Sequence, residues 1–183
     1  PEGAAEMPGV IVPRKTVTEL RKLINETTDD IVVGLSETKI RFSFDNAVLT
    51  SKLIDGTFPD YQRVIPEGND KKMEINAKVF ADAVDRVSAI SREKSRAVKL
   101  NLTNDNLTLS ASSSDDGNAT EEVEASYQGE ELEIGFNAAY LLDITRQIEG
   151  SNARLLLADA ASPTILSEVD DASTLYVLMP MRV

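Results

Sequence analysis

The 183-residue chain contains no cysteine, no histidine and no tryptophan. The absence of cysteine excludes a disulfide framework, a thiolate nucleophile and a cysteine-ligated zinc site. The absence of histidine removes the side chain that most often transfers protons near pH 7 and most often ligates metals. Any catalytic mechanism would therefore have to use Asp, Glu, Lys, Ser, Thr or Tyr.

Motifs of nucleotide and nucleophile chemistry are also missing. The sequence contains no Walker loop, no G-x-G-x-x-G loop and no G-x-S-x-G elbow. The stretch from Asp115 to Glu122 lacks the alternating ligands and the distant glutamate of an EF-hand. Its carboxylates are therefore predicted to be solvated loop residues. We expect a protein that is not an enzyme, with no catalytic residues, no bound metal and no cofactor.

Long hydrophobic runs are absent as well. No apolar run approaches the roughly 18–20 residues needed to cross a bilayer, and the N-terminus has no basic-then-apolar secretory pattern. Hydrophobic residues make up 42% of the chain and charged residues 27%, a balance typical of a globular protein. The natural expectation is a cytoplasmic protein without membrane contact.

Basic residues are the minority among the charges: 19 Lys and Arg stand against 31 Asp and Glu, for a net charge of −12. Taken over the whole chain, this charge argues against a basic nucleic-acid-binding module, because phosphate affinity depends on clustered Lys and Arg. It says nothing about where the charges lie. A protein that surrounds DNA loosely can be acidic outside and basic only on its inner lining.

The most informative feature that is present is an internal repeat with a period of about 60 residues. Each copy starts with a short apolar strand that runs into a helix, and the junctions at 12–15, 75–78 and 136–139 align without gaps. Three strand-like segments follow each helix: 31–35, 38–44 and 48–53; then 98–102, 107–111 and 121–127; then 154–158, 164–169 and 175–179. The sequence therefore predicts an α+β fold made of three β-α-β-β-β repeats.

The predicted helices run from Val17 to Glu26, from Val79 to about Ser91, and from Asn137 to about Gln147. Each carries one apolar stripe at helical spacing. The stripes are Val17, Leu20 and Ile24; Val79, Ala83, Val87 and Ile90; and Leu141, Ile144 and Ile148. Pro13, Asn76 and Asn137 suit helix starts, since Pro is tolerated in a first turn and Asn caps free N–H groups.

The repeat also predicts the domain organisation. One helix on four strands cannot cover both faces of its sheet, whereas two such units can pack as one α+β domain. Copies two and three are predicted to form a complete domain at 71–183, with two antiparallel helices against two four-stranded sheets. Copy one, at 9–66, lacks its sibling; 67–70 is the predicted linker, and 1–8 a loop or the cut end of an upstream segment. We therefore expect the chain to be part of a longer repeat array.

Four sequence blocks make this interpretation specific: residues 10–15 (VIVPRK), 50–61 (TSKLIDGTFPDY), 133–137 (EIGFN) and 176–182 (YVLMPMR). In this order and at these separations they closely resemble the bacterial DNA polymerase III β subunit family, the sliding clamps. The resemblance extends over essentially the whole chain after Pro8. It implies a DNA-clamp fold in a head-to-tail homodimeric ring of six similar subdomains. The chain would be the second half of the middle domain plus the complete C-terminal domain.

The resemblance also implies a function. Members of this family are processivity factors that encircle duplex DNA without sequence choice. A cleft between their middle and C-terminal domains takes linear peptides from the DNA polymerase III α subunit, the clamp loader and repair polymerases. Carried over by motif, the cleft would use Pro59, Arg63, Val64, Asn137, Tyr140, Pro163, Val177, Met179, Pro180, Met181 and Arg182. Flexible Met side chains suit such a cleft, because one pocket can then accept several apolar anchors.

Two further surfaces follow from the resemblance. The DNA-facing residues would be Arg21, Lys22, Arg86 and Arg146, which lie opposite or beside the apolar stripes. The ring interface would involve Ala89, Ile90, Asp115, Asp116, Glu121 and Glu122. Because the family's ring joins this domain to the N-terminal domain of the next subunit, the chain by itself is not expected to close a ring.

Two hypotheses from other classes remain open. The first is a stand-alone peptide-binding scaffold module that does not encircle DNA. The second is a carboxylate-based hydrolase, which would need two acidic residues converging in a deep pocket, and no spacing in this sequence predicts such a pair. On the residues alone, 177–181 and Tyr140 would be interpreted as core packing, and the basic helix residues as solvated faces.

Overall fold

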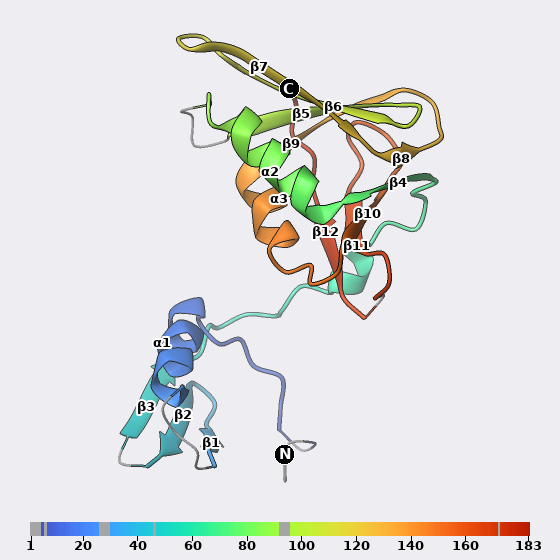
Figure 1. Ribbon diagram of the computed structural model, residues 1–183. Coiled ribbons are helices and arrows are strands. Elements are labelled where there is room, and N and C mark those ends of the chain that lie inside the picture. Colours follow the sequence, from blue (N-terminus) through green and yellow to red (C-terminus); the bar gives the residue numbers. More distant parts are fainter. Residues whose placement is uncertain (1–4, 6, 26–29, 46, 92–95, 172) are drawn as a thin grey trace. The chain divides into compact units, whose positions relative to one another are not determined.

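A computed structural model describes residues 5, 7–25, 30–45, 47–91, 96–171 and 173–183. The chain forms two compact units, Pro1–Asp60 and Tyr61–Val183, and Figure 1 labels the α-helices and β-strands of both. Most of the predicted segment 1–8 lies outside the described residues. Within those residues no helix is long and apolar enough to cross a membrane.

The first unit contains a helix and a three-stranded antiparallel sheet. Helix α1 (Arg14–Ile24) is followed by β1 (Val32–Leu35), β2 (Lys39–Phe44) and β3 (Ala47–Lys52), in the sheet order β1-β2-β3. The turn after β2 begins at Asp45, whose φ of 44° lies in the left-handed region that Asp tolerates better than most residues. The predicted opening strand of copy one is reduced to a single bridge between Ile11 and Ile54.

The small core of this unit is built by alternation along β2. Every second residue of the strand points toward α1 and is buried, namely Ile40, Phe42 and Phe44. Leu20 and Ile24 of the helix pack against them. The predicted stripe is wrong at Val17, which is exposed. Thr16 takes its place, because it lies four residues before Leu20 and so shares its face.

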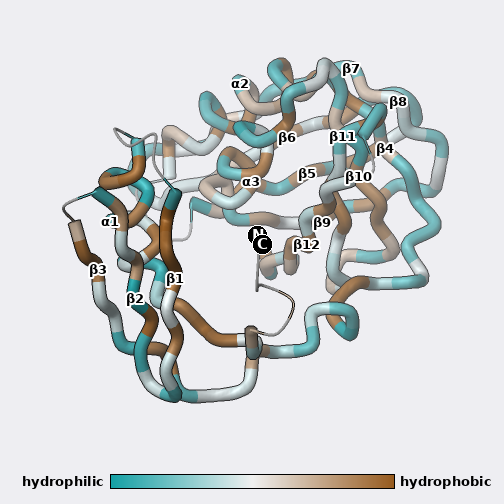
Figure 2. The backbone as a smooth tube through the Cα atoms, turned by 90° about the horizontal axis from the view of Figure 1, so that it is seen from below, coloured by the Kyte–Doolittle hydropathy of each residue, from teal (hydrophilic) through white to brown (hydrophobic). Residues whose placement is uncertain are grey.

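Exposed apolar side chains lie on both faces of this sheet, because Val32 pairs with Ser43 and Val33 pairs with the buried Phe42. Strand β1 is hydrophobic over most of its length, as Figure 2 shows, yet Val32 and Val33 are both exposed. Val48 of β3 is exposed as well. Apolar surface of this kind is available for packing against a further element or a partner.

The second unit holds the remaining elements. These are η2 (Tyr61–Val64), β4 (Lys71–Asn76), α2 (Ala77–Ser88), β5 (Ala97–Thr103), β6 (Asn106–Ser113), β7 (Gly117–Glu124), β8 (Ser126–Tyr127), β9 (Leu132–Asn137), α3 (Ala138–Thr145), β10 (Asn152–Leu157), β11 (Thr164–Glu168) and β12 (Leu175–Leu178). One sheet has the order β7-β6-β5-β9 and the other the order β12-β11-β10-β4-β8. Neighbouring strands are antiparallel in both sheets.

The segment predicted as one strand at 121–127 is in fact two strands in different sheets. Strand β7 pairs with β6, with Val123 opposite Leu107, whereas β8 pairs with β4, with Tyr127 opposite Met73. The chain changes sheets at the buried Ala125. The predicted pair of four-stranded sheets is therefore corrected to one of four and one of five strands. The burial alternation continues unbroken through the crossing, so the sequence pattern does not mark it.

Both helices of this unit begin at an asparagine cap, as the repeat junctions predict. The Val79 backbone N–H donates to Asn76 Oδ1 over 3.0 Å, and the Ala139 N–H donates to Asn137 Oδ1 over 2.9 Å. The two helices lie side by side and run in opposite directions (Figure 1). They begin at Ala77 and Ala138, and α2 starts two residues earlier than predicted.

One hydrophobic core joins the helices to both sheets. Its largest fully buried side chains are Tyr127, Phe80, Phe136, Met73, Leu100, Leu102, Leu107, Leu109, Ile134, Leu141, Leu155 and Leu157. The predicted stripe of α2 is wrong at Val79, which is exposed, because its neighbour Phe80 fills the core position of the first turn. The stripe of α3 is confirmed: Leu141 and Ile144 are buried, and Ile148 packs against the core.

The two units divide between Asp60 and Tyr61, whereas the sequence pattern placed the linker at 67–70. The difference has a physical reason in Asn69. Its side-chain amide donates to backbone carbonyls of Leu156 and Pro163, far along the chain in the second unit. Residues 67–70 are therefore tied into the second unit.

Candidate functional site

The last residues of the chain connect the two sheets of the second unit. Strand β12 pairs with β11, placing Leu178 opposite Thr164. The chain then leaves this sheet, and the Met181 backbone N–H donates to the Gly135 carbonyl of β9 over 2.7 Å. A Cβ atom on Gly135 would lie only 2.7 Å from the Met181 carbonyl oxygen and would collide with the Val183 side chain. Glycine at 135 therefore permits the close approach of the tail, defined here as residues 179–183.

The tail brings two of the predicted site regions together. Asn137 lies two residues after Gly135, at the end of β9, and its side chain caps α3. Tyr140 follows in the first turn of that helix and is 57% exposed. The bridge between Gly135 and Met181 thus holds the tail beside the strand end that presents Asn137 and Tyr140.

Pro163 reaches the same region from the other sheet. It immediately precedes Thr164, the partner of Leu178 in the β11–β12 ladder. The half-buried Val177 pairs with Ile165 in that ladder. Met179 comes directly after Leu178, the last residue of β12, and has 61% of its surface exposed. Pro163 and Met179 therefore extend from neighbouring strands at one end of the sheet.

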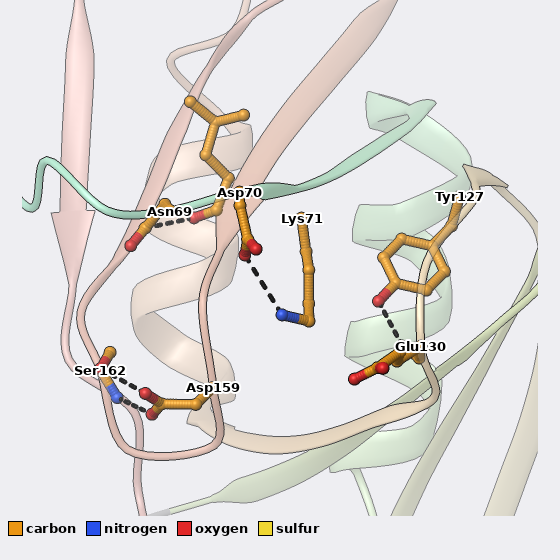
Figure 3. A network of polar contacts seen from close by, with 8 residues as sticks. Asn69, Asp70, Lys71, Tyr127, Glu130, Asp159 and Ser162 are labelled. Carbon is orange, nitrogen blue, oxygen red and sulfur yellow. Dashed lines mark hydrogen bonds and ion pairs between the residues drawn. The ribbon is translucent and has the colours of Figure 1, made fainter.

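Asn69 links Pro163 to the segment that carries Arg63 and Val64. Its Nδ2 atom donates to the Leu156 carbonyl over 2.7 Å and to the Pro163 carbonyl over 2.9 Å. Figure 3 shows this amide against the β10–β11 hairpin. The short helix η2, with Arg63 and the 56% exposed Val64, ends five residues before Asn69. The stretch after η2 is thus fastened to the loop that presents Pro163.

That loop is also braced from within. Asp159 Oδ1 accepts hydrogen bonds from the backbone N–H groups of Ala161 and Ser162, over 2.8 and 2.7 Å. The Ser162 hydroxyl donates to Asp159 Oδ2 over 2.8 Å (Figure 3). The bond from Ala161 first, and then those from Ser162, lower the pKa of Asp159, because they favour the charged carboxylate. The turn therefore holds its shape best when Asp159 is ionised.

These contacts place all the predicted peptide-site residues but one in the second unit, linked through the tail, the β11–β12 ladder and Asn69. The exception is Pro59, which belongs to the first unit. Three of the linked residues, Val64, Tyr140 and Met179, are large apolar side chains with more than half of their surface exposed. Exposed apolar groups on a rigid support are typical of a surface that binds apolar anchors. Core packing does not describe Tyr140 or Met179.

The predicted DNA-facing residues lie on α1, on α2 and, for Arg146, directly after the end of α3. Within the part of the chain that the structure describes, three of them make ion pairs. Lys22 Nζ lies 3.1 Å from Glu19 Oε1, and Arg146 Nη1 lies 3.5 Å from Asp143 Oδ1, each pair three residues apart in the chain. Such exposed pairs contribute little to stability. Lys22 and Arg21 belong to the first unit, and Arg146 to the second.

Arg86 has a more extensive interaction. Its guanidinium donates to both carboxylate oxygens of Glu121 on β7, over 2.5 and 3.0 Å. This fork raises the pKa of Arg86 and lowers the pKa of Glu121, in each case mainly through the hydrogen bonds between them. A predicted DNA-facing residue and a predicted interface residue are therefore bonded to each other.

The other predicted interface residues lie at the end of α2, on β7 and in the turn between β6 and β7. Ala89 is exposed at the end of α2, whereas Ile90 is half-buried and packs against the core of its own unit. Asp115 and Asp116 are exposed in the turn after β6, where their backbone N–H groups face the Ser113 hydroxyl. Glu122 is exposed on β7, which is an edge strand of its sheet. An edge strand offers backbone groups to a further strand.

Sequence reasoning missed three residues that support or border the predicted peptide site. Gly135 lies inside the quoted 133–137 block, but its role depends on the tail folding back from the end of the chain. Asn69 reads as a turn residue, and no local pattern indicates partners 87 and 94 positions away. Tyr61 is 62% exposed and lies two residues before Arg63 in η2. Its position at the end of the 50–61 block was the sequence signal that could have identified it.

Comparison with known proteins agrees with this geometry. Residues 62–182 match the family model of the DNA polymerase III beta subunit, C-terminal domain, and residues 1–60 match that of the central domain. The boundary between the two matches coincides with the division between the compact units. A curated beta sliding clamp from Caulobacter vibrioides is 51% identical over all 183 residues, which cover 49% of that relative. One from Vibrio cholerae is 36% identical over 94% of this chain and 47% of its own length.

Solved structures show the same relationship. A DnaN sliding clamp (DNA polymerase III subunit beta) from Bartonella birtlesii bound to griselimycin superimposes with a TM-score of 0.92 at 52% identity, covering 100% of this chain and 50% of that one. A DNA polymerase sliding clamp from Pseudomonas aeruginosa with ligand gives a TM-score of 0.86 at 40% identity, over 95% of this chain and 48% of that one. The chain spans about half the length of the curated relatives it matches. With two matching domain models and a shared fold, the chain belongs to the DNA polymerase III beta subunit family, the beta sliding clamps.

Proposed function

We propose that this chain is the protein-binding and part of the DNA-encircling portion of a sliding clamp. In the full-length protein, a homodimeric ring would surround duplex DNA without sequence choice and keep replication proteins on it. Its partners would include the DNA polymerase III α subunit, the clamp loader and repair polymerases, in the cytoplasm. Its role would be mechanical and non-enzymatic.

The observation that carries the proposal is the group of exposed apolar side chains at the tail. Val64, Tyr140 and Met179 project from three separate segments that the Gly135 bridge, the β11–β12 ladder and Asn69 fasten together. A linear peptide that buries apolar anchors there gains hydrophobic free energy without reordering the protein, because the support is already fixed. Arg182 is exposed at the rim, where a guanidinium can donate to peptide carbonyls or acidic neighbours.

Support for the DNA-encircling part is the family membership together with the basic residues on the helices. Arg21, Lys22 and Arg146 are exposed and would contact phosphates transiently, which gives affinity without sequence preference. The edge strand β7, with the Arg86–Glu121 pair beside it, would face the neighbouring subunit.

A peptide titration tests the protein-binding part. A fluorescently labelled peptide with a leading Gln and a trailing Leu-Phe pair should bind this chain. We expect micromolar dissociation constants when the cleft has all its walls and weaker binding for this chain, because ordering the peptide costs several kcal/mol. The same peptide with both anchors replaced by Ala is the control. Equal binding of the two peptides would contradict the proposal.

A sedimentation experiment separates a clamp from a stand-alone scaffold module. The chain, extended to the full length of its relatives and loaded on circular DNA, should co-sediment with it. It should be lost once the DNA is linearised, since a ring held by topology slides off an end. Retention on linear DNA would contradict a ring held by topology. Failure to load on circular DNA, together with normal peptide binding, would favour the scaffold module.

A further inference from the structure

We infer that Asn69 is a positioning residue of the peptide-binding surface, which it holds together from outside the surface. The inference rests on the proposed function and adds a residue that the surface itself does not contain. One side-chain amide joins the segment that carries Arg63 and Val64 to the loop that presents Pro163.

The geometry of the contact is that of a clasp. Leu156 is the second-to-last residue of β10 and Pro163 the last before β11, so their carbonyls stand on the two sides of the β10–β11 hairpin loop. The Asn69 Nδ2 atom, which carries two hydrogens, donates to both carbonyls, over 2.7 and 2.9 Å. The side chain therefore spans the mouth of the loop and fastens residue 69 to it.

The chemistry of this position favours an amide over its closest substitutes. Aspartate has the same shape but donates nothing when ionised, and it would place a negative charge against two carbonyl oxygens. Serine is shorter and has one hydrogen to donate. Asn69→Asp and Asn69→Ser would each leave at least one partly buried carbonyl without a hydrogen-bond donor.

The clasp acts on the surface from two directions. Pro163 is held directly, because its own carbonyl is the acceptor. Val64 is held through the chain, because four residues separate it from Asn69 and two of them, Ile65 and Pro66, are half-buried. Proline also fixes its own φ and so limits how far this stretch can rearrange. Releasing Asn69 should therefore let Val64 and Pro163 move independently.

Binding of the labelled Gln/Leu-Phe peptide provides the first test. Asn69→Asp should weaken it about tenfold, since two donated bonds are replaced by repulsion. Asn104→Asp makes the same chemical change at an exposed turn residue and should stay within about twofold. Equal effects of the two substitutions would overturn the inference. If Asn69→Asp does not fold, Asn69→Ser decides instead, and wild-type affinity for that variant would overturn it.

A second test distinguishes positioning from a general loss of stability. If Asn69 acts by placing Val64, its substitution should cost less binding in a Val64→Ala background, where the placed side chain is already gone. In a Tyr140→Ala background the cost should remain. A purely destabilising effect would be the same in both backgrounds, and that result would refute the positioning role.

A distance measurement keeps the inference testable even if the wild-type chain binds no peptide, an outcome that would refute the proposed function alone. The chain has no native cysteine, so spin labels can be attached through Val64→Cys and Ala160→Cys without background labelling. The distribution of distances between these two labels should be narrow with Asn69 and broad with Asn69→Asp. An unchanged distribution would show that Asn69 does not hold these segments in place.

Discussion

Truncation of Met179 is the sharpest test of the proposed peptide surface. The side chain is 61% exposed, so most of its apolar surface is still available for a partner. Full burial of a Met side chain contributes about 1.5–3 kcal/mol. The exposed share of that is about 1–2 kcal/mol, which corresponds to a loss of roughly five- to thirtyfold in affinity for Met179→Ala.

The buried share of the Met179 side chain determines how much Met179→Ala lowers the free energy of unfolding. The minor share of Met179 that is already buried contributes about 1 kcal/mol at most to the free energy of unfolding. Met179→Ala should therefore lower the free energy of binding by somewhat more than the free energy of unfolding. Fluorescence anisotropy with the labelled Gln/Leu-Phe peptide measures the first quantity, and urea unfolding measures the second.

Two controls make the experiment decisive. Val79→Ala removes an apolar side chain of comparable exposure, 46%, from the first turn of α2, and Lys22→Ala removes a charge from α1. Neither residue belongs to the proposed surface, and neither substitution should change peptide affinity by more than about twofold. The proposed peptide surface would be refuted if Lys22→Ala weakened peptide binding as much as Met179→Ala, or if Met179→Ala left peptide binding unchanged.

Three further outcomes follow from contacts described above. Gly135→Ala should cost about 1–3 kcal/mol of stability by overpacking and should weaken peptide binding, because the new methyl group displaces the tail; unchanged urea unfolding would contradict this. Phe80→Ala, at a fully buried position, should cost about 3–5 kcal/mol in the same assay, and a cost below that of Gly135→Ala would be unexpected. The lowered pKa of Asp159 predicts that its turn is stabilised above the ordinary value of 3.8 and released as the pH falls through the lowered pKa. The Ala161 and Ser162 amide NMR shifts should thus titrate below pH 3.8, and a midpoint above it would refute the argument.

The sequence predicts the elements of this fold well because its repeats carry their own local signals. Asn76 and Asn137 mark helix starts that the structure confirms as caps, and the α3 stripe of Leu141, Ile144 and Ile148 points to the core. Errors arise at the first turns. Val17 and Val79 are apolar but exposed, since a shift of one residue turns a helix face by about 100°.

Long-range pairing is what the pattern could not predict. The crossing at Ala125 preserves the alternation of buried and exposed residues, so only the partners, β6 before it and β4 after it, reveal two strands. The same limit applies to the site. The blocks at 133–137 and 176–182 identified its residues by resemblance, but the bridge between Gly135 and Met181 and the clasp at Asn69 join positions far apart in the chain.

The crossing at Ala125 also has a mechanical consequence. Because β7 and β8 are one continuous backbone, the edge strand of one sheet is covalently strapped to the edge strand of the other. The hydrogen bond from Met181 to Gly135 fastens the same two sheets a second time, through β12 and β9. A tensile load applied along β7 would therefore be shared with β4 through β8, and the two sheets would resist shearing apart. A load on that edge would therefore move the tail together with the whole unit, because the two sheets would stay in contact.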